Sequence, residues 1–205
     1  MSSDNYISSF CSIKNNTISL NGSKVYSDEN IEFSEFIKAA YKSLDTNYPK
    51  FFKMDALSKL AFLAADVLLK NENLNSEEEN DIAIVFSNKA SSLDTDRKHQ
   101  KSIDNEEDYF PSPAVFVYTL PNICIGEISI KYKLFSENSF FIFENFNAQH
   151  LLDYSNSLLA TGKTDKVLCG WVELDGDQYD AYLYLVTKTG TTTHNKKNII
   201  KFYNT

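Results

Sequence analysis

Long apolar runs and cysteines are the features that this sequence lacks most clearly. No stretch of about 18 or more apolar residues occurs, which excludes a segment long and apolar enough to span a bilayer. The three cysteines are an odd number without metal-ligand spacing. The first residues, Met1 to Asn5, lack the basic start and apolar core of a secretion signal. These absences predict a protein of the reducing cytoplasm with no membrane partner.

Basic residues are also in deficit. The chain carries 20 lysines and arginines against 28 aspartates and glutamates, for a formal net charge of -8. The acidic residues are concentrated at positions 71–81 and 94–108. A surface of this sign repels phosphate backbones, so nucleic acid is excluded as the main partner.

Short chemical motifs are absent too. The sequence contains no Gly-rich phosphate loop, no zinc-type spacing, no paired-carboxylate motif and no Ser/His/Asp arrangement. It therefore predicts neither a metal nor a cofactor. Cys11 and Cys169 lie in apolar segments and are interpreted as packing residues. Cys124, in a predicted loop, is the one plausible reactive thiol, although no histidine or helix start lies beside it to lower its pKa.

The pattern of apolar residues predicts alternating strands and helices. Strands are predicted at 6–13, 81–87, 139–143, 166–174 and 180–188, with a hairpin over 14–22. Helices are predicted at 34–44, from an N-cap at Asp55 to the acidic linker at 71, and at 148–160. The segment 114–120, which starts at a proline, is predicted as a short helix or an extended segment. The stretch 88–108 is predicted as polar and irregular, with His99 and the distant His194 at the surface.

These elements predict one α/β domain over residues 1–205. Strands that alternate with helices indicate a mixed five-stranded sheet, mostly parallel, with helices on both faces. The tight turn Asp175-Gly176-Asp177 joins the last two strands, so one antiparallel edge strand is expected.

The segment 136–170 has a distinctive layout. An apolar strand is followed by a sharp junction, Glu144 to Asn147, then by the helix 148–160, Gly162 and a second strand. The helix has one apolar stripe, which contains Leu151 and Leu158, and a polar face with Gln149, Asp153, Asn156 and Ser157. This pattern predicts a helix that covers a single sheet and faces water or a polar partner surface.

Several segments resemble, in order, the N-terminal half of the β-ketoacyl synthases, which have the thiolase fold. Lys53-Met54-Asp55 is similar to the family's basic residue, methionine and aspartate at a helix start. Ser112-Pro113 is similar to its serine-proline helix, and 126–130 to the isoleucine-serine strand that follows. Gly162 and the strand at 166–170 are similar to the segment after the nucleophile helix. The resemblance implies a thiolase-like half.

The resemblance also implies a lost nucleophile. The family's cysteine lies at the strand-to-helix junction, and its position corresponds to Asn145, preceded by Glu144. A carboxamide does not form a thioester, and the sequence up to Thr205 does not include the family's second half with its two histidines. No catalytic residue is therefore predicted. Asn145 is a turn residue, since Asn tolerates left-handed backbone geometry, or a retained binding residue, or the alignment with the family is shifted at this point.

Half-length relatives without the cysteine resemble chain-length factors. The resemblance implies a non-catalytic subunit that pairs with a full ketosynthase in fatty-acid or polyketide/aryl-polyene-type biosynthesis, and that meets the acyl carrier protein indirectly. The family's dimer forms by antiparallel pairing of the strand before the nucleophile. The implied interface or acyl-tunnel candidates are Phe116, Tyr118, Ser139, Phe140, Phe141, Ile142 and Phe143. The resemblance thus makes 139–143 an apolar edge strand, and because it is apolar on both faces, it is predicted to be buried on both, by the sheet or by a partner.

Two alternatives stay open. The chain could be an acyltransferase or 3-oxoacyl-ACP synthase-like enzyme that uses Cys124 or another non-standard nucleophile, which predicts a covalent acyl adduct. It could instead be a homodimeric binding scaffold. Gene neighbourhood would separate these hypotheses from the chain-length-factor interpretation.

Overall fold

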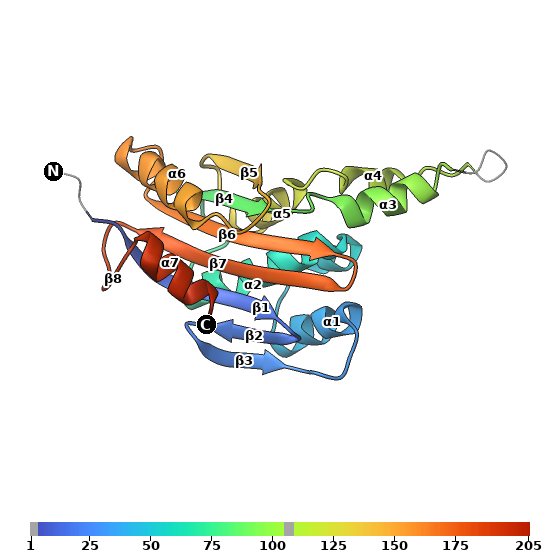
Figure 1. Cartoon of the computed structure of the whole chain (residues 1–205), viewed down its shortest axis with the longest axis horizontal. Helices are drawn as coiled ribbons and strands as arrows, with labels where there is room; N and C mark the ends of the chain where they lie inside the picture. Colours follow the sequence, from blue (N-terminus) through green and yellow to red (C-terminus); the bar gives the residue numbers. More distant parts are fainter. Residues whose placement is uncertain (1–3, 105–108) are drawn as a thin grey trace.

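The computed structural model describes residues 4–104 and 109–205. Within these residues the strands form one eight-stranded sheet in the order β3-β2-β1-β7-β6-β4-β5, with β8 paired to β1 (Figure 1). The strands are β1 (Tyr6–Lys14), β2 (Thr17–Leu20), β3 (Ser23–Ser27), β4 (Ile82–Asn88), β5 (Asn138–Ile142), β6 (Lys166–Asp175), β7 (Gln178–Thr187) and β8 (Thr192–Thr193).

Helices lie on both faces of the sheet, as predicted. They are α1 (Phe33–Ser43), the 3-10 helix η1 (Pro49–Lys53), α2 (Ala56–Asn71), α3 (Leu93–Lys101), α4 (Pro113–Val117), α5 (Ile123–Tyr132), α6 (Ala148–Ala160) and α7 (Lys196–Tyr203). None of the described helices is long and apolar enough to cross a membrane.

The α/β class is confirmed, but the prediction of five mostly parallel strands is wrong. Only β5, β4 and β6 run parallel, and β7, β1, β2 and β3 continue the sheet in antiparallel pairs. Tight turns explain the difference. Asn15 and Asn16 have φ values of 47° and 53°, and Gly176 has a φ of 60°. Left-handed residues in short loops turn the chain back on itself, which places consecutive strands antiparallel.

One core lies under α1, α2 and α5. Asp55 caps α2 as predicted, because its carboxylate accepts a hydrogen bond from the Ser58 amide at 2.9 Å. Most of α2 is buried, since it packs on the sheet and also contacts α1 and α5. Its buried Asp66 accepts hydrogen bonds from Thr46 and Tyr132, at 2.8 and 2.7 Å, and pairs with Lys70. A buried carboxylate satisfied in this way fixes neighbouring segments to α2.

The second core lies between the sheet and α6. The buried stripe of α6 includes Leu151 and Leu158, while Gln149, Asp153 and Ser157 are exposed, which agrees with the predicted one-sided helix. Helix α7, which was not predicted, packs beside α6 on this face and buries Ile199 (Figure 1).

Two further sequence expectations are wrong. The segment around Gly126, predicted as a loop that leads into a strand at 126–130, is helix α5, whose apolar residues pack on α2. The stretch 88–108 contains helix α3, and its residues 105–108 lie outside the described residues. Strand β5 is the edge strand that the resemblance implied, and it is only partly buried, because no further strand covers its outer edge in the described part of the chain.

Candidate functional site

The junction between β5 and α6 is the first part of the candidate site. Asn147 is the N-cap of α6 and accepts a hydrogen bond from the His150 amide at 3.0 Å. Glu144 and Asn145 are exposed. Asn145 is not among the residues with positive φ, so its presence does not reflect a need for left-handed geometry. The chain bends at Glu144 and Asn145 without a positive φ, and Asn147 then caps the helix.

Two contacts hold this junction in place. The Phe143 amide donates a hydrogen bond to the Asn88 carbonyl at 2.9 Å, which continues the β5–β4 ladder. The Phe146 ring lies against Tyr203 of α7, with 4.2 Å between ring centroids, and against Trp171 of β6 at 6.1 Å. Phe146 therefore packs the junction onto the sheet and α7, while Asn145 stays exposed.

A cavity of ≈ 350 Å³ opens at this junction. It is lined by 143–149 together with Lys196 and Ile200 of α7. This lining contains no cysteine, serine or threonine, and its ionisable groups are Glu144 and Lys196. The thiol and hydroxyl side chains that serve as nucleophiles in many acyl transfers are therefore not part of this lining.

The thiols lie elsewhere and are all buried. Cys11, Cys124 and Cys169 are free and have no exposed surface. Burial raises the pKa of Cys169 to about 12 and places the pKa values of Cys11 and Cys124 still further above their ordinary value. Cys124, predicted in a loop, lies within α5 and is part of the hydrophobic core. None of the three has the exposed, electropositive setting of a reactive thiol.

His194 is buried rather than at the surface. Its Nδ1 lies 3.2 Å from the Asn156 Oδ1, and its ring faces Tyr184 at 5.7 Å. Burial lowers its pKa to about 4, so the ring is neutral at pH 7. His150 packs against the Phe141 ring at 4.3 Å. Among the described residues, no group of three or more potential ligands is placed to hold a metal.

Strand β5 is the second part of the site, and it is an edge strand. It pairs with β4 alone, in parallel, from Asn138 opposite Ile84 to Ile142 opposite Asn88. Its side chains alternate as predicted: Phe140 packs towards the α2 core, and Phe141 lies on the α6 side against Tyr154 at 5.2 Å. Ile142 is 50% exposed.

The hydrogen-bond pattern shows which groups of β5 are free. The Glu137 carbonyl accepts a hydrogen bond from the Ile84 amide at 3.0 Å, and the Phe143 amide donates to Asn88. Residues of one parity in a strand bond to the same neighbour. Phe141 therefore points its amide towards β4, while the amide of Ile142 points to the open edge.

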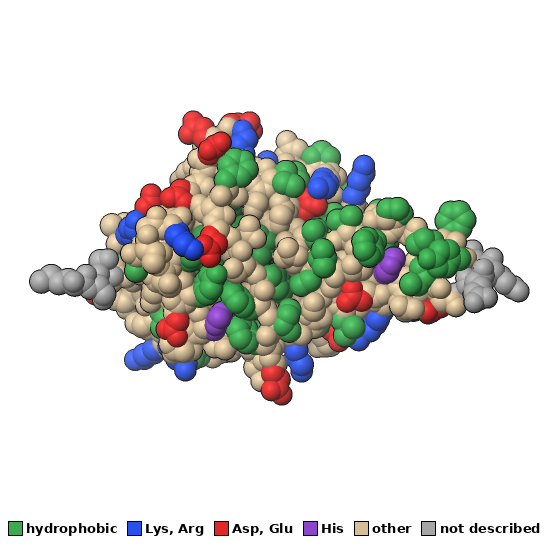
Figure 2. Space-filling view, turned by 90° about the horizontal axis from the view of Figure 1, so that it is seen from above, with side chains coloured by type: hydrophobic (Ala, Val, Ile, Leu, Met, Phe, Trp, Pro, Cys, Tyr) green, Lys and Arg blue, Asp and Glu red, His purple; other side chains and the backbone are tan. Residues whose placement is uncertain are grey.

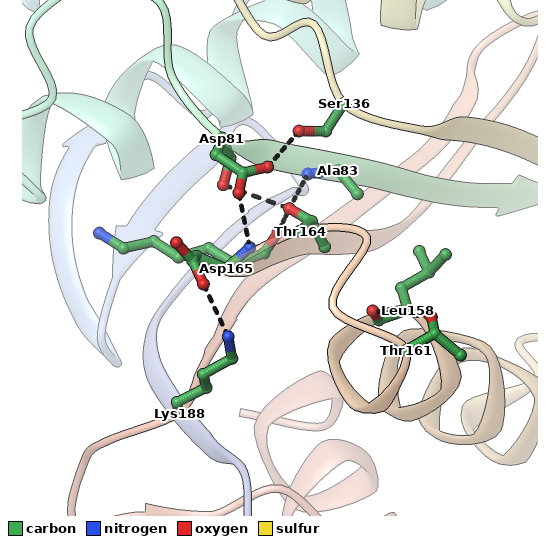
Figure 3. A network of polar contacts seen from close by, with 9 residues as sticks. Asp81, Ala83, Ser136, Leu158, Thr161, Thr164, Asp165 and Lys188 are labelled. Atoms are coloured by element: carbon green, nitrogen blue, oxygen red, sulfur yellow. Dashed lines mark hydrogen bonds and ion pairs between the residues drawn. The ribbon is translucent and has the colours of Figure 1, made fainter.

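Polar contacts fix the entry of β5. Asp81, which precedes β4, accepts hydrogen bonds from the Ser136 hydroxyl and from the Asp165 amide (Figure 3). These contacts, led by the bond from Ser136, lower the pKa of the Asp81 carboxyl. One carboxylate thus ties together the starts of three parallel strands.

A second set of contacts ties β5 to α6. The Glu137 carboxylate pairs with Lys163 at 2.7 Å and accepts a hydrogen bond from the Tyr154 hydroxyl at 2.9 Å. The Ser139 hydroxyl lies 3.0 Å from that of Tyr154. Ser139 is therefore engaged within the chain, and β5 is held in a defined position.

Exposed apolar side chains lie on the same stretch of chain as β5. We define the apolar surface as the large exposed hydrophobic residues from α4 to β5, namely Phe116, Val117, Leu120, Ile130, Phe135 and Ile142. Figure 2 shows exposed apolar side chains spread over the face of the molecule seen from above. Phe116 and Phe135 are 60% and 68% exposed. An exposed apolar surface beside an open strand is typical of a protein interface.

Phe116 and Tyr118, the two interface candidates predicted on one helix, have different surroundings in the structure. Phe116 is exposed, whereas Tyr118 is buried and donates a hydrogen bond to Glu127 at 2.9 Å. Burial, followed by this bond, raises the pKa of the Tyr118 hydroxyl. Tyr118 therefore holds α4 on α5 and does not face a partner. No sequence pattern indicated this, because the buried carboxylate lies on a helix that was not predicted.

Solved structures with a similar fold identify the type of fold. No protein-family model and no curated protein sequence matches the chain. The chain is similar to the ishigamide ketosynthase/chain length factor, with 14% identity, a TM-score of 0.64, and coverage of 90% of this chain and 62% of that one. The chain spans less than two thirds of that relative's length.

Two further complexes have similar folds. One is a ketosynthase in complex with its chain length factor from Xenorhabdus doucetiae, with 15% identity, a TM-score of 0.63, and coverage of 98% of this chain and 90% of that one. The other is a type II polyketide synthase acyl-carrier protein in complex with its ketosynthase bound to the hexaketide, with 14% identity, a TM-score of 0.66, and coverage of 91% and 63%. The chain therefore has the fold of a ketosynthase-like half of the thiolase type.

Proposed function

We propose that this chain is a non-catalytic, chain-length-factor-like subunit that pairs with a full ketosynthase in fatty-acid or polyketide-type biosynthesis. The observation that carries the proposal is the open edge of β5, which lies next to the apolar surface and directly before a junction without a cysteine. The fold likeness to complexes of ketosynthases with chain length factors supports it.

The edge of β5 is the proposed pairing strand. An apolar strand with free amide and carbonyl groups tends to add another strand. Two groups of contacts, around Asp81 and Glu137, already hold β5 in place, so little ordering would be needed on pairing. Ile142 and Phe140 would present the free backbone groups.

Phe116 is our candidate for limiting the partner's acyl pocket. Its ring is exposed on α4 and lies 5.3 Å from the His99 ring. Replacement by alanine should lengthen the acyl product of the paired ketosynthase if the ring closes the pocket.

We place the complex in the cytoplasm, where the three free thiols would stay reduced. An acidic acyl carrier protein would then dock mainly on the partner, since this chain carries a net charge of -8.

Co-expression tests the pairing. The chain is produced with the ketosynthase encoded next to it, and the complex is analysed by size-exclusion chromatography with light scattering. We expect one-to-one co-elution, which Ile142→Pro should abolish because it removes the outward amide and the exposed side chain. Lys24→Pro, on the opposite edge strand β3, is the matched control and should leave pairing intact.

Other outcomes would replace the proposal. A stable dimer of this chain alone, also lost in Ile142→Pro, would favour the homodimeric scaffold. A covalent adduct after incubation with an acyl thioester, detected by mass spectrometry of intact protein, would favour the acyltransferase. Failure of the folded chain to co-elute with the ketosynthase would contradict pairing.

A further inference from the structure

A second cavity shares no lining residue with β5 or with the junction between β5 and α6. It is formed where α1, the start of α2, α3 and α4 meet, and its volume is ≈ 350 Å³. Ile37, Met54 and Tyr118 contribute buried apolar surface to its lining, and Phe33 and Val115 lie partly exposed beside them. The size is within the range of small-molecule sites, about 300 to 1,000 Å³.

Four lysines converge on this cavity. Lys38, Lys53 and Lys98 are exposed, and Lys59 is half-buried. Lys98 pairs with Asp94 at 2.6 Å. Within residues 4–104 and 109–205, the other three form no ion pair. On a chain with a net charge of -8, this is a local excess of positive charge.

The carboxylate that lines the cavity is already engaged. Asp55 accepts the Ser58 amide at 2.9 Å with one oxygen and the Thr95 hydroxyl at 2.7 Å with the other. It therefore serves the start of α2 and the attachment of α3. Burial, and next the charge of Lys38, lower the pKa of Lys59, while Asp55 acts in the opposite direction. The positive charge of Lys38 therefore acts on Lys59 across the cavity.

We propose that this cavity binds a small amphipathic anion. Its apolar part would occupy the space above Ile37 and Met54, and its carboxylate or phosphate would lie among the lysines. The arrangement suits such a ligand because the apolar lining is buried and the cationic groups lie at the opening. An anion would also relieve the repulsion between the lysines. This site does not depend on the pairing proposed for β5.

Titration of the isolated chain tests the proposal. Octanoate, octyl phosphate and octanol are added separately, and methyl shifts are followed by NMR at Ile37, Met54 and Val115. We expect saturable shifts at these methyls for one or both anions, with affinity at least about tenfold above that of octanol and weaker at high salt. The two anions distinguish a carboxylate from a phosphate ligand. Shifts confined to Ile130 and Ile142 would show binding at the apolar surface and overturn the site.

Matched variants sharpen the test. Lys59→Met keeps the apolar stem and removes the charge, and should weaken binding of the anion about fivefold or more. Ala114→Trp, at the cavity mouth, should block binding by size. Lys24→Met changes an exposed lysine on β3 and should have no effect. An equal loss of anion affinity in the Lys24 and Lys59 variants would show that only the overall charge of the chain matters, and would contradict a specific site.

Discussion

The two edges of the sheet are built differently. Strand β3, at one end, carries the charged Lys24, and its pairing with β2 contains a register shift next to Ile18. Strand β5, at the other end, reads Asn-Ser-Phe-Phe-Ile, with no charge, no proline and no register shift. Charges and irregular pairing are the usual ways in which proteins prevent an edge strand from adding another chain.

This difference indicates that only one edge is closed to partners. The contacts of Asp81 and Glu137 hold β5 rigidly, although its outer groups are unpaired in the described part of the chain. An unprotected strand would be an aggregation hazard in a free protein. The contrast between the edges therefore supports the use of β5, and not β3, as a docking strand.

The largest expected effect on stability is at β5, where a proline on the side facing β4 should be far more damaging than a proline on the open side. Phe141→Pro removes an amide that points to β4 and a ring packed on Tyr154, so we expect a loss of about 3 kcal/mol of unfolding free energy. Ile142→Pro removes an outward amide and should cost about 1 kcal/mol or less. Urea unfolding of the isolated chain measures both. Equal losses would show that the assigned hydrogen-bond parity is wrong.

A pH effect should arise beside β1 and β8, far along the sheet from β5. His194 has a pKa of about 4 in the folded chain, against an ordinary histidine value of 6.5, so the folded state binds its proton less readily. The stability it contributes is complete above pH 6.5 and is lost as pH falls towards 4, by about 3 kcal/mol. Thermal unfolding between pH 7 and 4 measures the loss.

The control for this prediction is His194→Asn. It should flatten the stability profile between pH 6.5 and 4, because asparagine does not titrate. A profile unchanged by the substitution would assign the pH effect to other groups.

An intermediate effect is expected where β5 enters the sheet. Asp81→Ala removes the contacts with Ser136 and the Asp165 amide, so we expect a loss of about 2 kcal/mol. Amide hydrogen exchange should increase at Ser139 and Phe141, whose amides face β4, and stay unchanged in β3. Because the pKa of Asp81 is lowered on folding, its contribution should be present above the ordinary value of 3.8 and lost below it. Uniform acceleration across both edges would contradict a local role.

The smallest effect on stability is expected at the protected edge. Lys24→Ile should change the free energy of unfolding by less than about 0.5 kcal/mol, because the residue is exposed. It should nevertheless increase self-association, seen by light scattering, since the edge loses its charge. Unchanged association would show that the register shift alone protects β3.

Much of the fold could be predicted from local patterns. The Asp55 cap, the spacing of leucines in α2 and the uniformly apolar β4 each report a residue's immediate surroundings. The alternation of Phe140 and Phe141 was also confirmed, because strand geometry dictates it. Sequence resemblance further placed the junction at 144–147 between a strand and a helix.

The failures share a physical cause. Residues 123–132 contain Gly126 and several isoleucines, which favour turns and strands, yet they form α5 because α2 offers an apolar surface to pack on. Helix α3 was missed because it buries only Thr95 and so has no apolar stripe. His194 looked polar in sequence, but the fold covers it.

Short-range periodicity and residue identity were enough to predict the α/β class, the Asp55 cap, the one-sided α6 and the absence of a cysteine at the junction. Packing in three dimensions was needed for the rest. It turned Phe116 outward while Tyr118 bonds to Glu127, and it brought four lysines to one cavity. These features join residues far apart in the chain, and no local pattern records which distant segments will meet.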